Sequence, residues 1–158
     1  MKNVMIKTSK CGDGVFATRT IQSGELIMQF RGPIIRRADM PYPYPKNDDH
    51  WVQVGEDEYM GPSGGPDDFV NHSCDPNAGL KLESSSVVLV AIKKIKKGEE
   101  VTWDYSTTMF NDDWIIECMC GSLICRGQIR EFRYLSADLK KHYVDLGIVP
   151  KYVNSEEV

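Results

Sequence analysis

This chain of 158 residues lacks any long apolar run. No segment approaches the roughly 20 apolar residues that a membrane-spanning helix requires. The opening residues, Met1–Lys7, also lack the apolar stretch of a secretory signal peptide. We therefore expect an intracellular protein, cytoplasmic or nuclear, that has no membrane partner and keeps its thiols reduced.

An excess of basic charge is missing as well. The 19 lysines and arginines are outnumbered by 23 acidic residues, which gives a net charge of −4. Proteins that bind nucleic acid directly usually carry a basic patch or stripe. The one basic run, residues 93–97, precedes Gly98 and is typical of a solvated strand end. We expect no direct nucleic-acid partner, and a mildly acidic body suits a cationic partner such as a lysine-bearing peptide.

The length and the hydrophobic share of 41% predict a single domain with a real core. Helical spacing is confined to the end of the chain, where Ser136 is a suitable N-cap and Gly147 a suitable C-cap. Short β-type runs dominate the rest, and we expect a mostly β fold of small sheets with one C-terminal helix. The expected strands cover residues 4–8, 15–17, 26–30, 51–54, 58–60, 87–92 and 101–105.

Glycine and proline mark the expected turns. Gly12 and Gly14 flank Asp13 in what reads as a turn into the strand at 15–17. These glycines would also let the backbone approach a ligand and present exposed amides to a carboxylate. The proline-rich residues 41–45 are excluded from a central strand because proline lacks an amide donor, so we expect a surface loop there.

Three cysteines, Cys118, Cys120 and Cys125, form a Cys-x-Cys-x4-Cys motif. In a reducing compartment this spacing favours a metal over a disulfide, and thiolates suit tetrahedral zinc. Three ligands leave one position, for which the chain offers Cys11, Cys74, His50, His72 and His142. If Cys74, in a polar turn-forming stretch, fills it, the set has four sulfur ligands. Such a set leaves no position for water, so the zinc would be structural. The alternatives are small buried cysteines without metal and an open catalytic zinc site.

Four stretches, taken in order, resemble the SET-domain methyltransferases that carry a cysteine-rich post-SET tail. The first is weak by itself, whereas the second, and the third together with the cysteine motif, are specific. The resemblance covers about residues 1 to 130. The stretches are Gly12–Ala17 (GDGVFA), Asn71–Asn77 (NHSCDPN), Gly98–Tyr105 (GEEVTWDY) and Cys118–Gly127.

The resemblance implies a fold of small curved sheets in which residues 71–77 and 98–105 cross in a knot-like arrangement. It also implies a SET domain at residues 1–110, a zinc-bound post-SET segment at 111–132, and a C-terminal helix and tail at 133–158. In the family, a post-SET segment folds over the site once zinc orders it. We therefore expect zinc removal to abolish activity.

The activity implied by the resemblance is transfer of a methyl group from S-adenosylmethionine to a lysine of a protein, such as a histone or histone-like protein. The cofactor and the lysine would enter from opposite faces of the crossing. Tyr105 would stand at the point of methyl transfer, and structural zinc would be held by Cys74, Cys118, Cys120 and Cys125. Cofactor binding is expected at Gly12, Asp13, Gly14, Asn71, His72 and Tyr105.

The chemistry asks little of the protein, because an amine can displace the methyl group directly once it is neutral and in line. With a pKa of ~10.4, roughly one lysine in 2,500 is neutral at pH 7, and an apolar channel disfavours the charged form. Held geometry would supply much of the remaining acceleration. The hydroxyl of Tyr105 fits as an orienting group. The other reading of Tyr105 is a strand-end aromatic in the core, and His72 likewise reads as a satisfied polar residue.

Two aromatic residues depart from the family pattern in the expected lysine channel. Phe30 stands where the family commonly has a tyrosine, and Trp103 stands where it usually has phenylalanine or tyrosine. These departures leave a catalytically silent peptide-binding module as the alternative function, and a zinc-stabilised DNA-binding protein as a third that the acidic balance disfavours. Other aromatic residues either line the channel or pack in the core; these are Tyr59, Phe69, Phe110 and Trp114.

Overall fold

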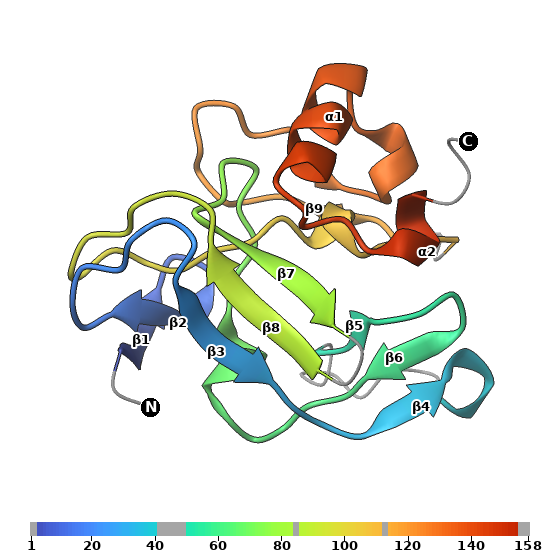
Figure 1. The fold of residues 1–158 in the computed structure, drawn as a ribbon, viewed down its shortest axis with the longest axis horizontal. Helices are drawn as coiled ribbons and strands as arrows, with labels where there is room; N and C mark the ends of the chain where they lie inside the picture. Colours follow the sequence, from blue (N-terminus) through green and yellow to red (C-terminus); the bar gives the residue numbers. More distant parts are fainter. Residues whose placement is uncertain (1–2, 41–49, 84–85, 112–113, 155–158) are drawn as a thin grey trace.

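A computed structural model describes residues 3–40, 50–83, 86–111 and 114–154. Within these residues the strands form four small antiparallel sheets (Figure 1). The sheets are β1-β2, β3-β8-β7, β4-β6-β5 and β10-β9. The expected proline-rich loop at 41–45 lies outside the described residues. The strands are β1 Val4–Ser9, β2 Gly12–Ala17, β3 Leu26–Phe30, β4 Ile34–Arg36, β5 Val52–Gln53, β6 Glu58–Met60, β7 Ala78–Glu83, β8 Ser86–Ala91, β9 Ile116–Glu117 and β10 Gln128–Ile129.

The sheet β3-β8-β7 lies at the centre of the molecule (Figure 1). Its middle strand, β8, is rich in β-branched residues and pairs with both neighbours; Leu89 and its partner Leu80 are both fully buried. The apolar run at 87–92 predicts this strand, and the structure confirms it. Strand β7 was not predicted, because Gly79 interrupts its pattern. A Cβ at Gly79 would lie 2.5 Å from Ile148. Glycine at this position therefore allows Ile148 of the C-terminal region to pack closely against the strand.

The expected turn at Gly12–Gly14 is wrong. Strand β2 begins at Gly12, which pairs with Ser9 of β1, and Gly14 pairs with Lys7 further along the same ladder. The hairpin therefore turns at Lys10 and Cys11. Glycine is compatible with a turn and with a strand, which is why its presence alone did not locate the bend.

Residues 101–105 also differ from expectation, since they do not form a regular strand. The amide of Val101 donates to the carbonyl of Val15 at 2.7 Å, whereas the amide of Trp103 donates to the carbonyl of Asn71 at 3.2 Å. The segment changes partner within two residues, so no continuous ladder can form. Tyr105 then opens a short 3₁₀ helix, Tyr105–Thr107, which the Asp104 side chain caps.

The predicted C-terminal helix is confirmed as α1, Ala137–Asp145. Ser136 caps it by accepting from the Leu139 amide, and Gly147 follows in the left-handed region at φ 65°. Tyr143 is buried by this packing. A second short helix, α2 (Lys151–Asn154), was not predicted. None of the helices described is long and apolar enough to cross a membrane.

Candidate active site

Two segments that are distant in the sequence, residues 71–77 and 100–105, run side by side. His72 and Trp103 form a parallel bridge. The amide of Trp103 donates to the carbonyl of Asn71 at 3.2 Å, and the amide of Ser73 donates to the carbonyl of Trp103 at 3.1 Å. These contacts place the two motifs against each other, as the expected crossing requires.

A single side chain, Asn77, fastens this crossing. Its Nδ2 donates to the carbonyl of Glu100 at 2.7 Å, and its Oδ1 accepts from the amide of Thr102 at 3.0 Å. Asparagine suits this place because its amide offers a donor to one carbonyl and an acceptor to the amide two residues further on, along the same edge of the backbone. Asn77 belongs to the Asn71–Asn77 motif, but no role for it was expected from the sequence.

On one side of the crossing, Asn71 contacts the β1-β2 hairpin. Its Nδ2 donates to the carbonyl of Asp13 at 3.0 Å and to Oε1 of Glu100 at 2.8 Å, while Oε2 of Glu100 accepts from the hydroxyl of Ser9 at 2.8 Å. A Cβ at Gly14 would lie 2.3 Å from Glu100 Oε1, so only glycine fits there. The structure thus brings the expected cofactor residues Asp13, Gly14 and Asn71 together. It adds Glu100, which lies in the Gly98–Tyr105 stretch and was not expected at the cofactor site.

His72 connects Tyr105 with the cysteines. Its Nδ1 accepts from the amide of Tyr105 at 3.2 Å, and its Nε2 lies 3.4 Å from Sγ of Cys74. Burial lowers the pKa of His72 to about 4, although the nearby Asp104 carboxylate acts in the opposite direction. The neutral ring therefore carries its proton on Nε2, which donates toward the sulfur.

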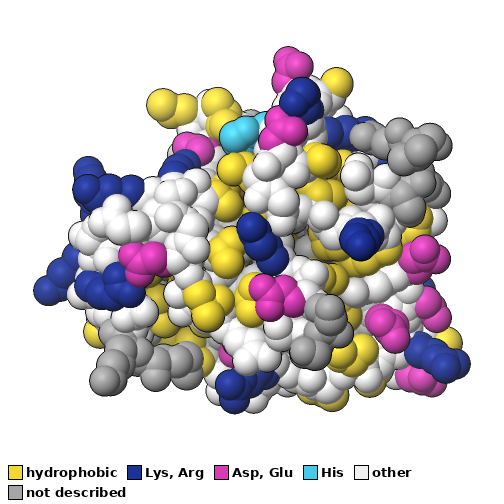
Figure 2. Space-filling model, viewed as in Figure 1, with side chains coloured by type: hydrophobic (Ala, Val, Ile, Leu, Met, Phe, Trp, Pro, Cys, Tyr) yellow, Lys and Arg dark blue, Asp and Glu magenta, His cyan; other side chains and the backbone are white. Residues whose placement is uncertain are grey.

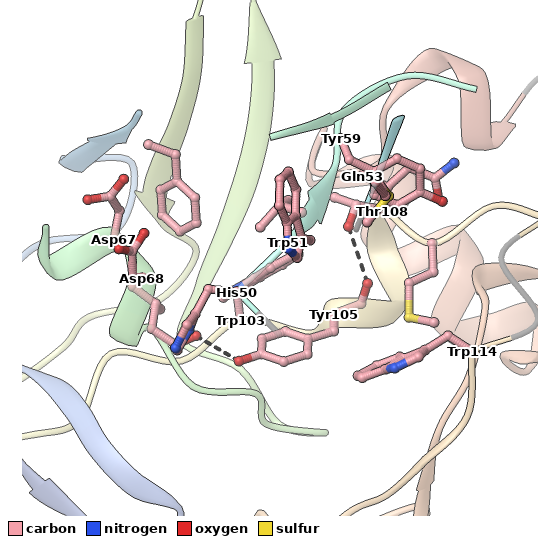
Figure 3. A pocket seen from close by; sticks show the side chains of 15 residues that line it. His50, Trp51, Gln53, Tyr59, Asp67, Asp68, Trp103, Tyr105, Thr108 and Trp114 are labelled. Carbon is pink, nitrogen blue, oxygen red and sulfur yellow. Dashed lines mark hydrogen bonds between the residues drawn. The ribbon is translucent and has the colours of Figure 1, made fainter. Parts of the chain in front are cut away.

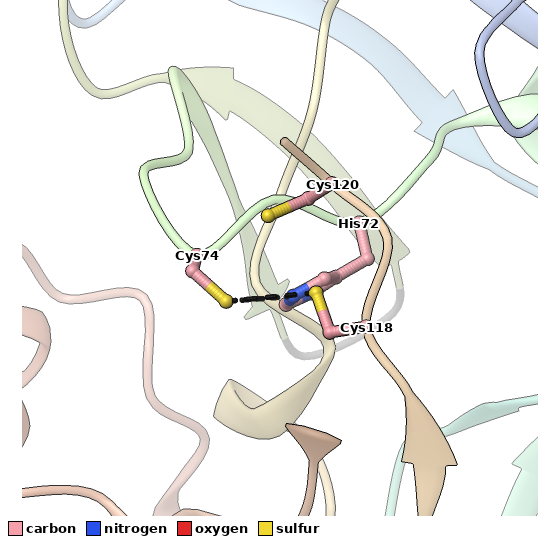
Figure 4. Close-up of side chains that lie close together, drawn as sticks. All are labelled: His72, Cys74, Cys118 and Cys120. Carbon is pink, nitrogen blue, oxygen red and sulfur yellow. Dashed lines mark hydrogen bonds between the residues drawn. The ribbon is translucent and has the colours of Figure 1, made fainter. Parts of the chain in front are cut away.

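The cysteine cluster lies beside His72 (Figure 4). The ligand atoms of His72, Cys74, Cys118 and Cys120 all lie within 4.8 Å of one another, and the sulfurs of Cys74 and Cys118 are 3.7 Å apart. Sγ of Cys125 is not one of this group but lies beside it: it contacts the carbonyl of Cys118 at 3.6 Å and also interacts with the thiols of Cys118 and Cys120. Three close thiols with a further nitrogen or sulfur ligand fit a tetrahedral structural zinc.

The hydrogen bonding of His72 bears on which residue would be the fourth ligand. A ring that accepts a backbone N–H at Nδ1 and binds metal at Nε2 would have to lose both protons, which is unfavourable for a neutral imidazole. Cys125 is therefore favoured over His72 as the fourth zinc ligand, as in the four-cysteine set expected from the resemblance. That set remains a prediction.

The thiols of the cluster differ in acidity. Burial raises the pKa of Cys74 and of Cys118. Burial also acts to raise the pKa of Cys120, but hydrogen bonds with the backbone amides of Cys74 and Ser122 outweigh it and lower the pKa to about 7. Cys120 therefore reaches the thiolate form, which is the form that binds metal, most readily.

On the other side of Tyr105 lies an aromatic pocket of about 110 Å³ (Figure 3). The hydroxyl of Tyr105 donates to the carbonyl of Val70 at 2.9 Å. The ring of Trp103 lies 4.9 Å from that of Tyr105 and meets Phe30 edge to face. Both expected channel residues therefore line this pocket. The remaining lining residues are Met40, His50, Trp51, Val52, Gln53, Tyr59, Asp67, Asp68, Thr108, Met109 and Trp114.

For four aromatic residues the sequence left open whether they line the channel or pack in the core; two line the pocket and two pack in the core. Tyr59 and Trp114 line the pocket. Phe69 packs against the main core, and Phe110 packs with the C-terminal helix region. Trp51, which the sequence did not single out, also lines the pocket; its indole nitrogen is buried and has no hydrogen-bond partner among the described residues.

Two carboxylates at the pocket, Asp67 and Asp68, were likewise not foreseen. They accept hydrogen bonds from backbone amides, Asp67 from Arg31 at 2.8 Å and Asp68 from Gly64 at 2.7 Å. Among the residues that the structure describes, no lysine or arginine forms an ion pair with either. Aromatic faces together with unpaired negative charge suit a cationic side chain.

Comparison with known proteins agrees with these motifs. The SET domain family model matches residues 12–106, so the chain belongs to the SET domain family. It is 29% identical over 141 residues to histone-lysine N-methyltransferase ASHH3 of Arabidopsis thaliana, covering 81% of this chain and 38% of that protein. It is 33% identical over 136 residues to a variant-silencing SET domain-containing protein of Plasmodium falciparum (isolate 3D7), covering 75% of this chain and 5% of that protein. The chain thus spans well under half the length of these relatives.

A solved structure shares the fold. The crystal structure of KRYPTONITE in complex with mCHH DNA, H3(1-15) peptide and SAH superposes with a TM-score of 0.66 at 24% identity, over 81% of this chain and 29% of that one. The small antiparallel sheets and the C-terminal helix are therefore those of the SET fold.

On the face shown in Figure 2, basic and acidic side chains occur across the surface without a continuous stripe of one sign.

Proposed function

We propose that this chain is a protein-lysine N-methyltransferase that uses S-adenosylmethionine. The observation that carries the proposal is the position of Tyr105. Its amide is bonded to His72, which follows Asn71 at the crossing, and its ring lines the aromatic pocket together with Trp103 and Phe30. A methyl donor on one side and a lysine on the other would meet at its hydroxyl.

The cofactor would lie against the hairpin and the start of the first crossing segment. We assign its binding to Gly12, Asp13, Gly14, Asn71, His72 and Tyr105. Bound there, S-adenosylmethionine supplies an electrophilic methyl group on a positively charged sulfur. Gly14 leaves room for close approach of backbone, and the Asn71 amide is held in place by Asp13 and Glu100.

The pocket would prepare the lysine. Loss of water inside the pocket and the positive sulfur of a bound cofactor would disfavour the charged amine more than the aromatic faces and carboxylates favour it, so the proton leaves to solvent before transfer. The Tyr105 hydroxyl and the Val70 carbonyl, 2.9 Å apart, would orient the neutral nitrogen. In the transfer itself a nitrogen–carbon bond forms as the carbon–sulfur bond breaks, and no nucleophilic residue or acid–base pair is needed.

Structural zinc and a lysine-bearing protein complete the proposal. We assign zinc to Cys74, Cys118, Cys120 and Cys125, where it would hold the tail against the crossing. Because relatives are named histone-lysine N-methyltransferases, histone tails are the first substrates to test, and a nuclear setting is favoured over a cytoplasmic one.

A silent peptide-binding module is the second candidate. The observation that favours it is Phe30, which lines the pocket without a hydroxyl and so offers the amine no hydrogen bond. The intact arrangement of Asn71, His72 and Tyr105 argues for catalysis.

The test is mass spectrometry of core histones and a cell lysate after incubation with zinc-loaded protein and isotope-labelled S-adenosylmethionine. Labelled methyl on lysine that is lost in Tyr105→Phe and kept in Tyr134→Phe supports the proposal. Tyr134 is a matched control because it is half exposed, and the structure places it outside the aromatic pocket. No label from a folded protein that binds the cofactor by calorimetry would instead identify the silent module.

A further inference from the structure

A buried carboxylate, Asp104, stands directly before Tyr105 and joins three parts of the chain. Its Oδ1 accepts from Nη2 of Arg126 at 2.8 Å and from the amide of Ser106 at 3.1 Å. Its Oδ2 lies 2.8 Å from Nη1 of Arg126 and accepts from the hydroxyl of Tyr143 at 3.0 Å. Arg126 thus lies against both carboxylate oxygens, with a charge-assisted hydrogen bond to Oδ1 and an ion-pair contact to Oδ2.

The partners of Asp104 come from distant elements. Arg126 follows Cys125 in the zinc segment, and its amide also lies 3.4 Å from Sγ of Cys74 as a donor. Tyr143 lies on α1 and is 1% exposed. Burial, together with the neighbouring carboxylate, raises the pKa of Tyr143, so its hydroxyl keeps its proton and acts as a donor.

The other end of this network reaches the proposed site of transfer. Asp104 caps the 3₁₀ helix that begins at Tyr105. The Tyr105 amide is held by His72, and its hydroxyl points to the carbonyl of Val70. A shift of the Asp104 carboxylate would therefore move the backbone that carries the Tyr105 ring.

We infer that Asp104 is a positioning residue, through which Arg126 of the zinc segment and Tyr143 of α1 hold Tyr105 in its working orientation. The inference rests on the proposed function for its catalytic meaning. It assigns α1 a role at the site although α1 contributes no residue to the pocket lining. It also gives the zinc segment a second attachment to the site besides the metal ligands.

The experiment compares Asp104→Asn and Tyr143→Phe with the control Tyr134→Phe, all in the zinc-loaded full chain. Loss of a hydrogen bond to a charged group corresponds to about a tenfold change, so kcat should fall about tenfold in Tyr143→Phe and further in Asp104→Asn. KM for the lysine peptide and the affinity for S-adenosylhomocysteine should stay within about twofold, because neither Asp104 nor Tyr143 is among the residues assigned to either ligand. Tyr143→Phe carries the test if Asp104→Asn does not fold.

A second readout does not depend on methyl transfer. NMR-detected amide exchange in Tyr143→Phe should accelerate at Tyr105 and Ser106, with no change at Leu89 in the central sheet. Unchanged kcat and unchanged exchange at Tyr105 would overturn the inference. Acceleration at Leu89 as well would also overturn it, because the pair would then only stabilise the fold.

The two proposals can fail separately. If the unmodified chain transfers no methyl group, the proposed function fails and amide exchange alone decides whether Tyr143 positions Tyr105. If methyl transfer is seen and the Tyr143→Phe chain matches it in kcat, the proposed function stands and the positioning role is lost.

Discussion

The central sheet and the crossing beside it are held together in different ways. In β3-β8-β7 the backbone ladder is continuous, and the buried side chains Leu80 and Leu89 are apolar. At the crossing the two segments share only an isolated bridge, and polar groups are buried beside apolar ones: Val101 is 0% exposed, Asp104 is 1% exposed, and Asn77 is half-buried. The sheet depends on the area that it buries, whereas the crossing depends on individual hydrogen bonds, each with a defined partner.

This difference shows why the site lies at the crossing. Regular strands satisfy their own backbone groups and present side chains in a fixed alternation. The irregular segments leave amides and carbonyls, such as those at Val70 and Tyr105, directed at side chains and at the pocket. Changes in the sheet should therefore affect stability first, and changes at the crossing should affect ligand binding and turnover first.

Zinc removal should give the largest effect and should separate the two regions. A structural zinc contributes on the order of 10 kcal/mol in small zinc domains, so a chelator should release the segment around β9 and β10 from Cys74. We expect methyl transfer to be abolished while β8 stays protected. Hydrogen exchange with mass spectrometry would show fast exchange at 116–129 and slow exchange at 86–91. Full activity in a zinc-stripped chain would contradict the assigned role of the tail as a cover.

Truncation in the sheet should come next. Leu89→Ala removes a fully buried side chain and should lower the free energy of unfolding by about 2–5 kcal/mol. Asn77→Ala at the crossing should lower it by only about 1–3 kcal/mol, the cost of leaving buried polar groups unpaired. Urea unfolding of both variants measures the difference. A larger loss of stability in Asn77→Ala would reverse the proposed division between the regions.

A matched pair of glycine substitutions sharpens the comparison. In Gly14→Ala the new Cβ meets Glu100 and Asn71, so we expect about tenfold weaker binding of S-adenosylhomocysteine with a modest loss of stability. In Gly79→Ala it meets Ile148, so we expect lower stability, by about 1–3 kcal/mol, and unchanged affinity. Calorimetry measures the affinity of each variant for S-adenosylhomocysteine, and thermal unfolding measures the stability of each variant. Equal effects of the two variants on affinity would remove Gly14 from the proposed cofactor site.

The smallest effect is expected at the pocket carboxylates. Asp67→Asn keeps the shape of the side chain and removes its charge, so KM for a lysine peptide should rise about two- to fivefold at low salt. The increase should shrink at about 0.5 M salt, because exposed charges are then screened. Asp39→Asn, outside the pocket, is the control. A rise in KM that is independent of salt would mean that Asp67 acts through the loop rather than through charge.

Much of the regular structure could be predicted from the sequence. The apolar run of β8 and the capping residues Ser136 and Gly147 have local signals that tertiary structure did not override. The start of β2 was taken for a turn and β7 was not predicted, because Gly12 and Gly79 are residues typical of turns. Only their pairing with neighbouring strands shows that they belong to ladders.

The site was predictable only as far as the resemblance reached. The motif residues Asn71, His72 and Tyr105 do come together. The partners of Asp104 could not be predicted, because Arg126 and Tyr143 lie 22 and 39 residues away and any arginine or tyrosine would have served equally in the sequence. Asp67 likewise gave no signal, since a carboxylate in a glycine-rich turn is ordinary.

The network around Asp104 also has a consequence for how the protein is made. The hairpin glycines near the start of the chain, both crossing segments, Arg126 and Tyr143 must all be present before Tyr105 is held from every side. Such distant contacts form late, because each long loop must close before its contact contributes. A polypeptide still growing on the ribosome would remain without full activity until α1 had emerged. A product that ended before Tyr143 would lack the contact that α1 makes with Asp104 and should have a lower turnover than the full chain.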